Sequence, residues 1–371
     1  MIYLDSAATS FLKPKSVKYA MVDAVENMSS PGRGTYLPAM RASDKVYDCR
    51  EKIAKLFNVK NPENVVLTFN ATHALNVAIR SLAKSGDKVL VSGYEHNSVT
   101  RPLKHIGAEI VVAESPLFEP EAAVDSFKKN IEDAGLVICN HVSNVFGYIQ
   151  PVEAISKMCR EAGVPLVIDA SQSAGVLDID FEALQASFVA MPGHKGLLGP
   201  QGTGVLLCGG NAKPIMFGGT GSASMEQNMP DFLPDRLEAG THNVPGISGL
   251  AAGVQYVLDV GAENIGKYER ELCTLMADIL SADKELEVFR SDNGSQAGVL
   301  SVRHKRIDPE SMCTMLGEHG VAARCGLHCS PLAHKTGGTI DTGTVRFSFS
   351  PFISREQVVK ACKEIEKVIN M

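Results

Sequence analysis

Short apolar runs rich in β-branched residues alternate with helix-like patterns through roughly the first 210 residues. This alternation is typical of strands joined by helices, and it favours an α/β fold with a mainly parallel sheet covered on both faces. The runs are apolar at consecutive positions, as expected of strands buried on both faces. The predicted strands are "NVVLTF" (64–69), "DKVLVSG" (87–93), "AEIVVAE" (108–114), "GLVICNHV" (135–142), "VPLVIDAS" (164–171), "SFVAM" (187–191) and "GVLLC" (204–208).

The pattern changes after about residue 245. A helical stretch over 247–281 is followed by shorter strand-like and helix-like segments, which together predict a smaller α+β domain. The sequence therefore predicts a large domain over 15–245 and a small domain made of 1–14 and 246–371. The later segments are "AGVLSVRH" (297–304), a helix near 308–319, "VAAR" (321–324), "TVRFSFS" (344–350) and a final helix over 354–370.

Composition narrows the class of protein. The 371 residues are 44% hydrophobic and 21% charged, which is ordinary for a globular chain with a substantial core. The net charge is −6 and no long Lys/Arg block occurs, so neither nucleic acid nor an anionic membrane is an expected partner. The first residues lack the basic and apolar regions of a signal peptide, which predicts a cytoplasmic location. The nine cysteines are an odd number, which argues against a disulfide framework.

Polar residues follow several predicted strands at the points where those strands end. In an open parallel sheet, ligands bind at the carboxyl ends of the strands. Asn70 is a plausible helix cap, and the N–H groups that follow it could face an anion. Asp169 and His96 also come at strand ends, although each taken alone reads as an ordinary cap or surface residue.

Lys195 lies in the glycine-rich run "AMPGHKGLLGPQGTG" (190–204). It is followed by Gly196, so the run does not fit a P-loop, in which Ser or Thr follows the lysine. A buried lysine amine readily loses its proton and bonds to aldehydes. A lysine, a carboxylate after a strand and a free helix N-terminus together match the aldehyde, the pyridinium nitrogen and the phosphate of pyridoxal phosphate.

The chain resembles the cysteine desulfurase/selenocysteine lyase family, which belongs to the class V aminotransferases of fold type I. Within it, the chain is similar to the branch that contains the Suf-system desulfurases. The resemblance implies a large domain with a seven-stranded sheet, a small C-terminal domain, and a homodimer with active sites at the interface. It rests on "YLDSAAT", "EHNSV", "HVSNVFG", "VIDASQSAG", "GHKGLLGPQGTG", "RLEAGTHN" and "RCGLHC", in the family's order.

The resemblance also implies roles for single residues around the cofactor. Lys195 would bond to its aldehyde, Asp169 would pair with the pyridinium nitrogen, and Gln172 would approach the phenolic oxygen. His96 would stack on the ring and count, with Lys195 and Cys329, among the catalytic residues. The cofactor phosphate would be held by the Ala71 N–H and by Thr72 and His194. Thr241 and the Gly218-Gly219 turn would reach the cofactor phosphate of the partner subunit.

The substrate side is implied in the same way. Arg346 would bind the α-carboxylate of the substrate in a bidentate fork. Asn144 would lie near the ring oxygen and that carboxylate, and Arg324 would also contribute to the substrate site. Four departures from the family pattern predict the loss of one or two phosphate contacts and an altered substrate pocket: Pro192, Ala71, His73 and "FIS" (352–354).

Cys329 completes an Arg-x-Gly-x-His-Cys motif with Arg324, Gly326 and His328. Positive charge on Arg324 and His328 is expected to stabilise its thiolate. The resemblance then implies that L-cysteine is converted to L-alanine while its sulfur becomes a persulfide on Cys329. An acceptor protein or thiol would take the sulfur by exchange, for iron–sulfur or other thio-cofactor synthesis.

Several alternatives remain open. Cys325 is either a tolerated small residue or a thiol that forms a reversible disulfide with Cys329. A metal site at Cys325, His328 and Cys329 lacks a clear fourth ligand, so no metal is expected. L-selenocysteine or another amino acid could be the substrate, as in a selenocysteine lyase or another class V enzyme. A non-enzymatic scaffold is disfavoured by the presence of Lys195, Asp169, His96 and Arg346.

Overall fold

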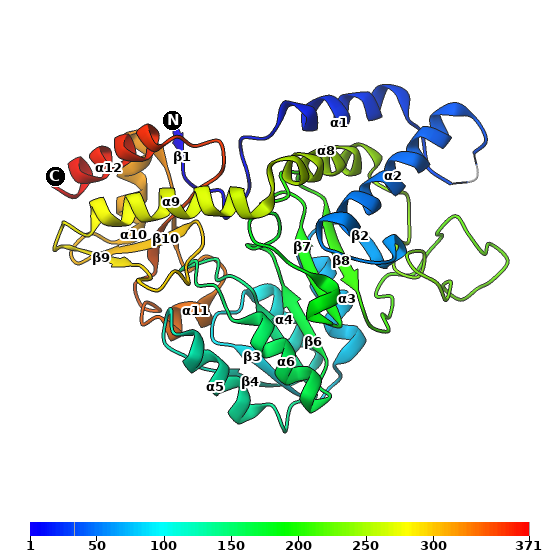
Figure 1. The fold of residues 1–371 in the computed structure, drawn as a ribbon, viewed down its shortest axis with the longest axis horizontal. Coiled ribbons are helices and arrows are strands. Elements are labelled where there is room, and N and C mark those ends of the chain that lie inside the picture. Colours follow the sequence, from blue (N-terminus) through cyan, green and yellow to red (C-terminus); the bar gives the residue numbers. More distant parts are fainter. Residues whose placement is uncertain (33, 371) are drawn as a thin grey trace.

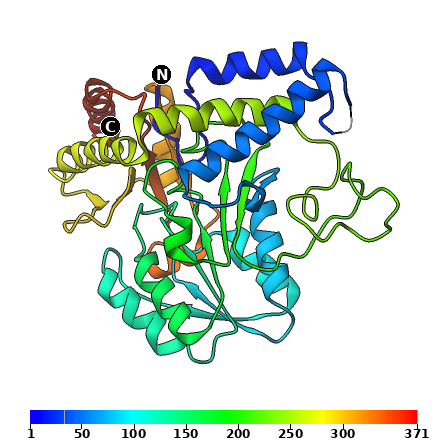
Figure 2. The same ribbon diagram turned by 45° about the vertical axis from the view of Figure 1, so that its right-hand side comes forward.

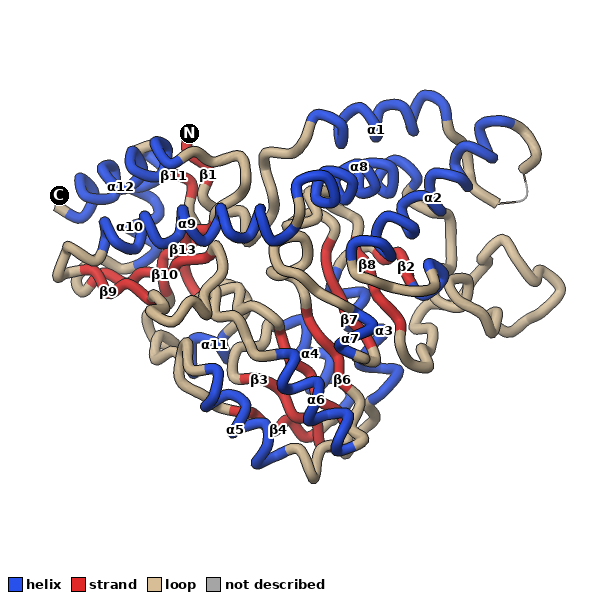
Figure 3. The backbone as a smooth tube through the Cα atoms, in the orientation of Figure 1, coloured by secondary structure: helices blue, strands red, loops and turns tan. Residues whose placement is uncertain are grey.

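A seven-stranded sheet forms the centre of the computed structural model, which describes residues 1–32 and 34–370 (Figures 1 and 3). Its strand order is β2-β8-β7-β6-β5-β3-β4, and β8 runs antiparallel to the other six strands, which share one direction. The prediction of a mainly parallel sheet of seven strands is confirmed. The strands are β2 (Val65–Thr68), β3 (Lys88–Ser92), β4 (Glu109–Ala113), β5 (Leu136–Asn140), β6 (Leu166–Asp169), β7 (Phe188–Pro192) and β8 (Gly204–Cys208).

Successive strand residues point to opposite faces of this sheet and are buried on both. On β2, Leu67 packs in a cluster with residues of several helices, while Val66 belongs to a separate cluster with side chains of α3 and α4. This double burial explains the continuous apolar runs in the sequence. The first face is covered by α2 (Leu37–Leu56), α5 (Pro120–Asn130), α6 (Val152–Ala162), α7 (Phe181–Leu184) and α8 (Val244–Val260), and the second by α3 (Ala71–Leu82) and α4 (Asn97–Ile106).

The C-terminal part forms a second layer of sheet and helices. Its four-stranded antiparallel sheet has the order β12-β13-β10-β9 and is covered by α9 (Ala262–Leu280), α10 (Pro309–Glu318) and α12 (Arg355–Ile369). The N-terminal strand β1 (Ile2–Tyr3) pairs in parallel with β11 (Val321–Ala322), so both chain ends lie in this part (Figure 2). The four strands are β9 (Leu286–Phe289), β10 (Val299–His304), β12 (Arg324–Gly326) and β13 (Thr344–Ser348).

The predicted helical stretch 247–281 is divided into two helices at Gly261, whose φ of +88° favours glycine. Helix α8 packs against α1 (Lys15–Asn27) and α2, whereas α9 packs against α12. The boundary of the two domains at residue 245 stays a prediction, and this packing favours a boundary at Gly261. Among residues 1–32 and 34–370, no helix combines the length and the apolar character needed to span a membrane.

Candidate active site

The carboxyl ends of the parallel strands surround a cavity with about 550 Å³ of free space, part of which is open to solvent. This is within the range of small-molecule sites in proteins. Its walls come from the ends of β5, β6 and β7 and from the first turns of α3 and α4. The structure brings together here eight of the residues predicted to bind the cofactor: Ala71, Thr72, His96, Asn144, Asp169, Gln172, His194 and Lys195.

Lys195 and Asp169 supply the charged groups of this cavity. The pKa of the Lys195 amine is lowered to about 8, mainly because burial disfavours the ammonium form, and the charges of Arg346 and Arg324 act in the same direction. The carboxylates of Asp169 and Asp5 act in the opposite direction. Asp169 is the last residue of β6, is buried, and accepts a 2.9 Å hydrogen bond from the Ser171 N–H.

The N-terminus of α3 provides the anion-binding end. Asn70 caps the helix through a 2.9 Å hydrogen bond from the His73 N–H to its side-chain oxygen. The N–H groups of Ala71 and Thr72 have no acceptor within the helix, and no hydrogen bond among the described residues uses them. A phosphate group could therefore accept hydrogen bonds from both. Pro192 also lines the cavity but has no N–H to donate.

The two cavity histidines are held neutral. His96 accepts a 3.0 Å hydrogen bond at Nδ1 from the Ser98 N–H, so its proton lies on Nε2. Burial is the largest cause of its lowered pKa. His194 contacts the Thr9 hydroxyl through Nδ1 at 3.0 Å, and burial lowers its pKa to about 4. Each ring thus offers one donor nitrogen and one acceptor nitrogen.

The side-chain amides of Asn144 and Gln172 are engaged by protein groups. Asn144 donates a 2.8 Å hydrogen bond to the His328 carbonyl and accepts one of 2.6 Å from the Ser330 hydroxyl. Gln172 donates to the Ala7 carbonyl at 2.9 Å. Asn144 therefore links the cavity to the loop that carries Cys329.

Arg346 lies just outside the cavity and is only 2% exposed. Its Nη1 atom donates to the Asn144 carbonyl at 2.9 Å, and its Nη2 atom lies 2.8 Å from Asp5 Oδ1. Its Nε atom is buried and has no partner among the described residues. Arg324 faces Arg346 across the β12–β13 pair, and its Nε atom lies 3.5 Å from Asp5 Oδ2. Asp5 is a site residue that sequence reasoning missed, although it stands in the quoted "YLDSAAT".

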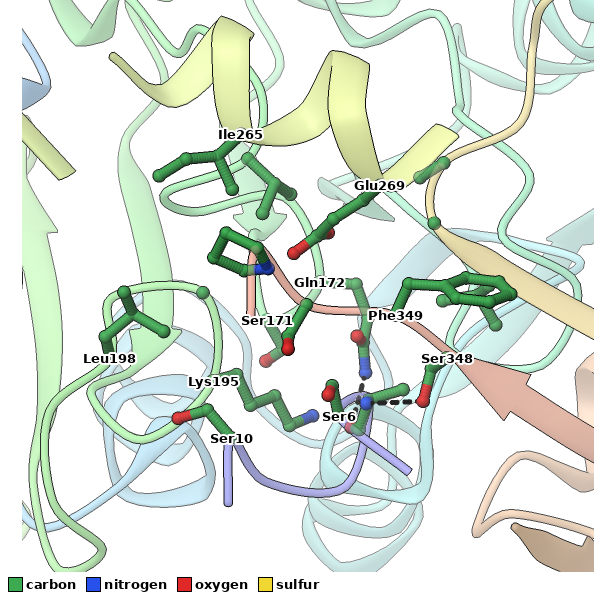
Figure 4. Close-up of a pocket in the computed structure, with 18 residues that line it drawn as sticks. Ser6, Ser10, Ser171, Gln172, Lys195, Leu198, Ile265, Glu269, Ser348 and Phe349 are labelled. Atoms are coloured by element: carbon green, nitrogen blue, oxygen red, sulfur yellow. Dashed lines mark hydrogen bonds between the residues drawn. The ribbon is translucent and has the colours of Figure 1, made fainter. Parts of the chain in front are cut away.

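A second cavity shares Ser171, Gln172 and Lys195 with the first (Figure 4). Figure 4 shows the Glu269 carboxylate of α9 pointing into it. Burial raises the pKa of Glu269 to about 8. Glu269 was also missed from the sequence, because it belongs to a helix whose position beside Lys195 is set only by the fold.

Cys329 lies in the loop between β12 and α11 (Pro331–Thr336), and its side chain is exposed. His328 and Cys329 both have left-handed backbone conformations, with φ of 49° and 56°. The Cys329 carbonyl accepts a 2.8 Å hydrogen bond from the Asn97 N–H, next to His96. Although Cys329 does not line the cavity, its loop is thus bonded to two segments that do.

The family model described as aminotransferase class-V matches residues 2–360. The chain belongs to the class-V aminotransferase family. It is 33% identical to a protein named probable cysteine desulfurase from Methanothermobacter thermautotrophicus, in a match spanning all of this chain and 95% of that protein. It is 29% identical to the cysteine desulfurase CsdA of Escherichia coli, again over the whole chain and 94% of that protein.

Solved structures agree with this membership. The apo cysteine desulfurase of Thermococcus onnurineus NA1 superposes with a TM-score of 0.90 at 31% identity, covering 100% of this chain and 94% of that one. The Escherichia coli CsdA structure gives a TM-score of 0.87 at 27% identity, with the same coverage of each chain. These matches confirm the resemblance drawn from the sequence motifs and the fold class that it implied.

One prediction about this class-V family member is wrong: His328 is not a positive neighbour of Cys329. Its ring is buried and nearly coplanar with that of His334, with centroids 5.6 Å apart. Burial lowers its pKa to about 2, and the positive charge of Arg346 adds to the effect, so the ring is neutral. Arg324 and Arg346 remain as positive groups near the loop.

Cys325 lies in β12. The pKa of Cys313 on α10 is raised, mainly by burial and secondly by the nearby Cys325 thiol. Both thiols are free, as is that of Cys329. A disulfide between Cys325 and Cys329 stays a prediction.

Gly219 and Thr241 are not brought to the cavity. They belong to the segment between β8 and α8 that projects from the body in Figures 1 and 2. The Gly240 N–H donates to the Gly219 carbonyl at 2.8 Å, and Thr241 lines a different cavity together with His73. Their contact with a partner subunit's phosphate stays a prediction.

Proposed function

We propose that this protein is a pyridoxal-phosphate-dependent cysteine desulfurase. It would convert L-cysteine to L-alanine, place the sulfur on Cys329 as a persulfide, and pass it to an acceptor thiol. One observation carries the proposal: the Lys195 amine, the Asp169 carboxylate and the free N-terminus of α3 line a single cavity whose edge is bonded to the Cys329 loop. The named relatives support the same activity.

The residues present fit pyridoxal phosphate. Lys195 has a lowered pKa, so a substantial fraction of its amine is neutral and able to bond to the aldehyde. Asp169 supplies a buried carboxylate for the pyridinium nitrogen, and the N–H groups of Ala71 and Thr72 remain free for the phosphate. His96 would lie against the ring. When bound, the cofactor would supply an electron sink for the electrons released at the substrate Cα.

The remaining work falls to side chains of this chain. Lys195 would remove the Cα proton, because its lowered pKa makes it a usable base near neutral pH. Arg346 would hold the substrate carboxylate, since its buried guanidinium has a free Nε atom and a second nitrogen shared only with Asp5.

Cys329 would take the sulfur directly from L-cysteine. The Cys329 thiolate attacks the sulfur of L-cysteine, and an S–S bond forms while the Cβ–S bond breaks. The electron pair of the broken bond stays on carbon, which takes up a proton and becomes the methyl group of alanine. An external thiolate then attacks the persulfide and removes the outer sulfur. The exposure of Cys329 gives such an acceptor access.

We also propose a homodimer. Helices α1 and α2 leave a row of apolar side chains exposed, which is typical of a protein interface. The projecting segment with Thr241 would then reach the partner's cavity. Sedimentation analysis would test this, and a monomer with full activity would contradict it. The exposed residues are Tyr19, Val22, Val25, Leu37, Met40 and Tyr47.

The deciding experiment is alanine and sulfide release from L-cysteine in the presence of a reductant. We expect equal amounts of both products from the wild type and neither from Cys329→Ala or Lys195→Ala. Cofactor absorbance should persist in Cys329→Ala, which serves as the control for a folded site. Sulfide released together with pyruvate by Cys329→Ala would instead indicate β-elimination. A selenocysteine lyase would use the same lysine and arginine, so these residues do not distinguish it from a desulfurase. The same assay with L-selenocysteine as the substrate makes that distinction.

A further inference from the structure

A chain of hydrogen bonds runs behind the Cys329 loop through two buried histidines. His328 Nε2 lies 3.3 Å from the Arg324 carbonyl oxygen, and His328 Nδ1 lies 3.3 Å from His334 Nε2. His334 Nδ1 in turn lies 2.7 Å from the Thr339 hydroxyl. The two rings are almost parallel, at 12°, and His334 and Thr339 are completely buried. This chain connects β12, the Cys329 loop, α11 and the turn before β13.

The positions of the protons along this chain follow from its carbonyl end. A carbonyl can only accept, so His328 must carry its proton on Nε2. A second proton on His328 is disfavoured by burial and by nearby Arg346, which lower its pKa to about 2. His328 Nδ1 is therefore an acceptor, and His334 must donate to it from Nε2. His334 Nδ1 is then an acceptor as well, and the Thr339 hydroxyl must donate to it.

This arrangement supports a strained part of the chain. His328 and Cys329 occupy the left-handed region, which is unfavourable for side chains other than glycine. Their carbonyl groups are bonded to Asn144 and Asn97, so the backbone is fixed on one side. The His328 ring fixes it on the other side, since its two nitrogens bond to the Arg324 carbonyl and to the His334 ring. Strained conformations persist only where surrounding contacts hold them in this way.

We propose that His334 and Thr339 are positioning residues for sulfur transfer: they anchor the His328 ring in the tautomer that the Arg324 carbonyl requires, and so hold the loop that presents Cys329. The inference rests on the proposed desulfurase function. Neither residue touches the cofactor cavity, so their loss should leave cofactor binding and Cα proton removal intact. It should slow only the step in which the Cys329 sulfur must meet the substrate sulfur, because that step requires accurate approach of two atoms.

The sharpest test compares Thr339→Val with Thr339→Ser. Valine has the shape of threonine but no hydroxyl, so His334 Nδ1 loses its donor, whereas serine keeps the donor. In a single turnover of the holoenzyme with L-cysteine, persulfide on Cys329 is followed by mass spectrometry and the cofactor by absorbance. We expect persulfide formation to slow at least tenfold in Thr339→Val and to stay within about twofold of wild type in Thr339→Ser, with unchanged absorbance in both.

A second variant, His334→Phe, keeps a buried aromatic ring at this position but removes both nitrogens. It should match or exceed the loss in Thr339→Val. Persulfide formation at the wild-type rate in both variants would overturn the proposal, and so would a loss of cofactor absorbance that paralleled the loss of rate.

A separate readout distinguishes failure of this inference from failure of the proposed function. ¹⁵N NMR of histidine-labelled protein should show the Nε2–H tautomer for both His328 and His334, whatever the substrate is. A proton on Nδ1 of His334 in the wild type would overturn the inference even if desulfurase activity is found. If the wild type does not act on L-cysteine but the predicted tautomers are present and Thr339→Val shifts the His334 Nδ1 resonance, the hydrogen-bonded chain stands and the proposed activity fails.

Discussion

Arg346 Nη2 lies 2.8 Å from Asp5 Oδ1, so the guanidinium expected to bind the substrate carboxylate is already paired within the protein. Arg324 shares the same carboxylate at 3.5 Å. Asp5 is thus the counter-ion of two arginines, one of them fully buried. An arriving carboxylate must either displace Asp5 from Nη2 or bind to the free Nε atom of Arg346.

Replacing Asp5 with Asn should tighten substrate binding and weaken the fold. The substrate carboxylate would no longer compete with a resident anion, so we expect the KM for L-cysteine to fall about threefold to tenfold, which corresponds to roughly 1 kcal/mol. Arg346 would lose its buried counter-ion, and the free energy of unfolding should drop by about 1–3 kcal/mol. Steady-state kinetics and urea denaturation measure the two effects. An unchanged KM would mean that the substrate carboxylate does not compete with Asp5 for Nη2 of Arg346.

The contact between Asp5 and Arg346 could not be predicted from the sequence. The two residues are 341 positions apart, and their contact depends on the N-terminal segment lying beside β13. Strand runs are local patterns, and they predicted the sheet, whereas the family resemblance implied the eight cofactor residues that line one cavity in the structure. Long-range ion pairs leave no such local pattern.

Burial is the second property that sequence reasoning could not supply. His328 stands next to Cys329, and adjacency suggested a positive neighbour for the thiolate. In the fold its ring is buried and bonded to the His334 ring, where a charge would be costly. Similarly, nothing in the helical pattern of 262–280 indicated that the Glu269 carboxylate would point into a cavity beside Lys195 (Figure 4).

The lowered pKa of Lys195 predicts how apoprotein takes up its cofactor. With a pKa of about 8, about a quarter of the amine is neutral at pH 7.5, against about one part in a thousand for an ordinary lysine. The rate of covalent attachment of pyridoxal phosphate should therefore rise from pH 6.5 to about pH 8 and then level off. Stopped-flow absorbance measures this rate, and Lys195→Ala is the control without attachment. A rate that continues to rise up to pH 10 would contradict the lowered pKa.

Glu95 should make the fold less stable as the pH rises towards 8. Ser92 Oγ lies 2.5 Å from Glu95 Oε1 and 2.9 Å from Asn140 Oδ1, and its single proton cannot serve both. A proton on Glu95 resolves this conflict, because Glu95 can then donate to Ser92 and Ser92 to Asn140. Burial raises the pKa of Glu95 to about 8, and the nearby Asp169 adds to the effect.

The sign follows from proton binding. Between about pH 4.5 and pH 8 the folded chain keeps a proton on Glu95 that the unfolded chain releases, so stability falls as the pH rises, by up to about 1.4 kcal/mol per pH unit. Glu95→Gln removes this contribution, and its free energy of unfolding should depend less steeply on pH than that of the wild type. Denaturant titrations at pH 5.5, 6.5 and 7.5 provide the comparison. Parallel curves for the two proteins would show that Glu95 is ionised in the fold.

The buried ion pair of Arg50 and Glu238 should be more sensitive to losing one partner than to losing both charges. The two side chains are 5% and 3% exposed, and Glu238 also accepts a 2.6 Å hydrogen bond from the Leu67 N–H. Arg50→Met leaves a buried carboxylate without its cation, which costs about 3–5 kcal/mol.

Adding Glu238→Gln to Arg50→Met removes the stranded charge and keeps an acceptor for Leu67, so the double variant should recover part of the lost stability. Urea denaturation of the single and double variants measures the difference. Arg290→Met breaks a more exposed pair with Asp278 and should cost at most about 1 kcal/mol. The expectation fails if the double variant is less stable than Arg50→Met by more than the loss measured for Arg290→Met. Glu238 would then stabilise the fold through contacts other than its charge.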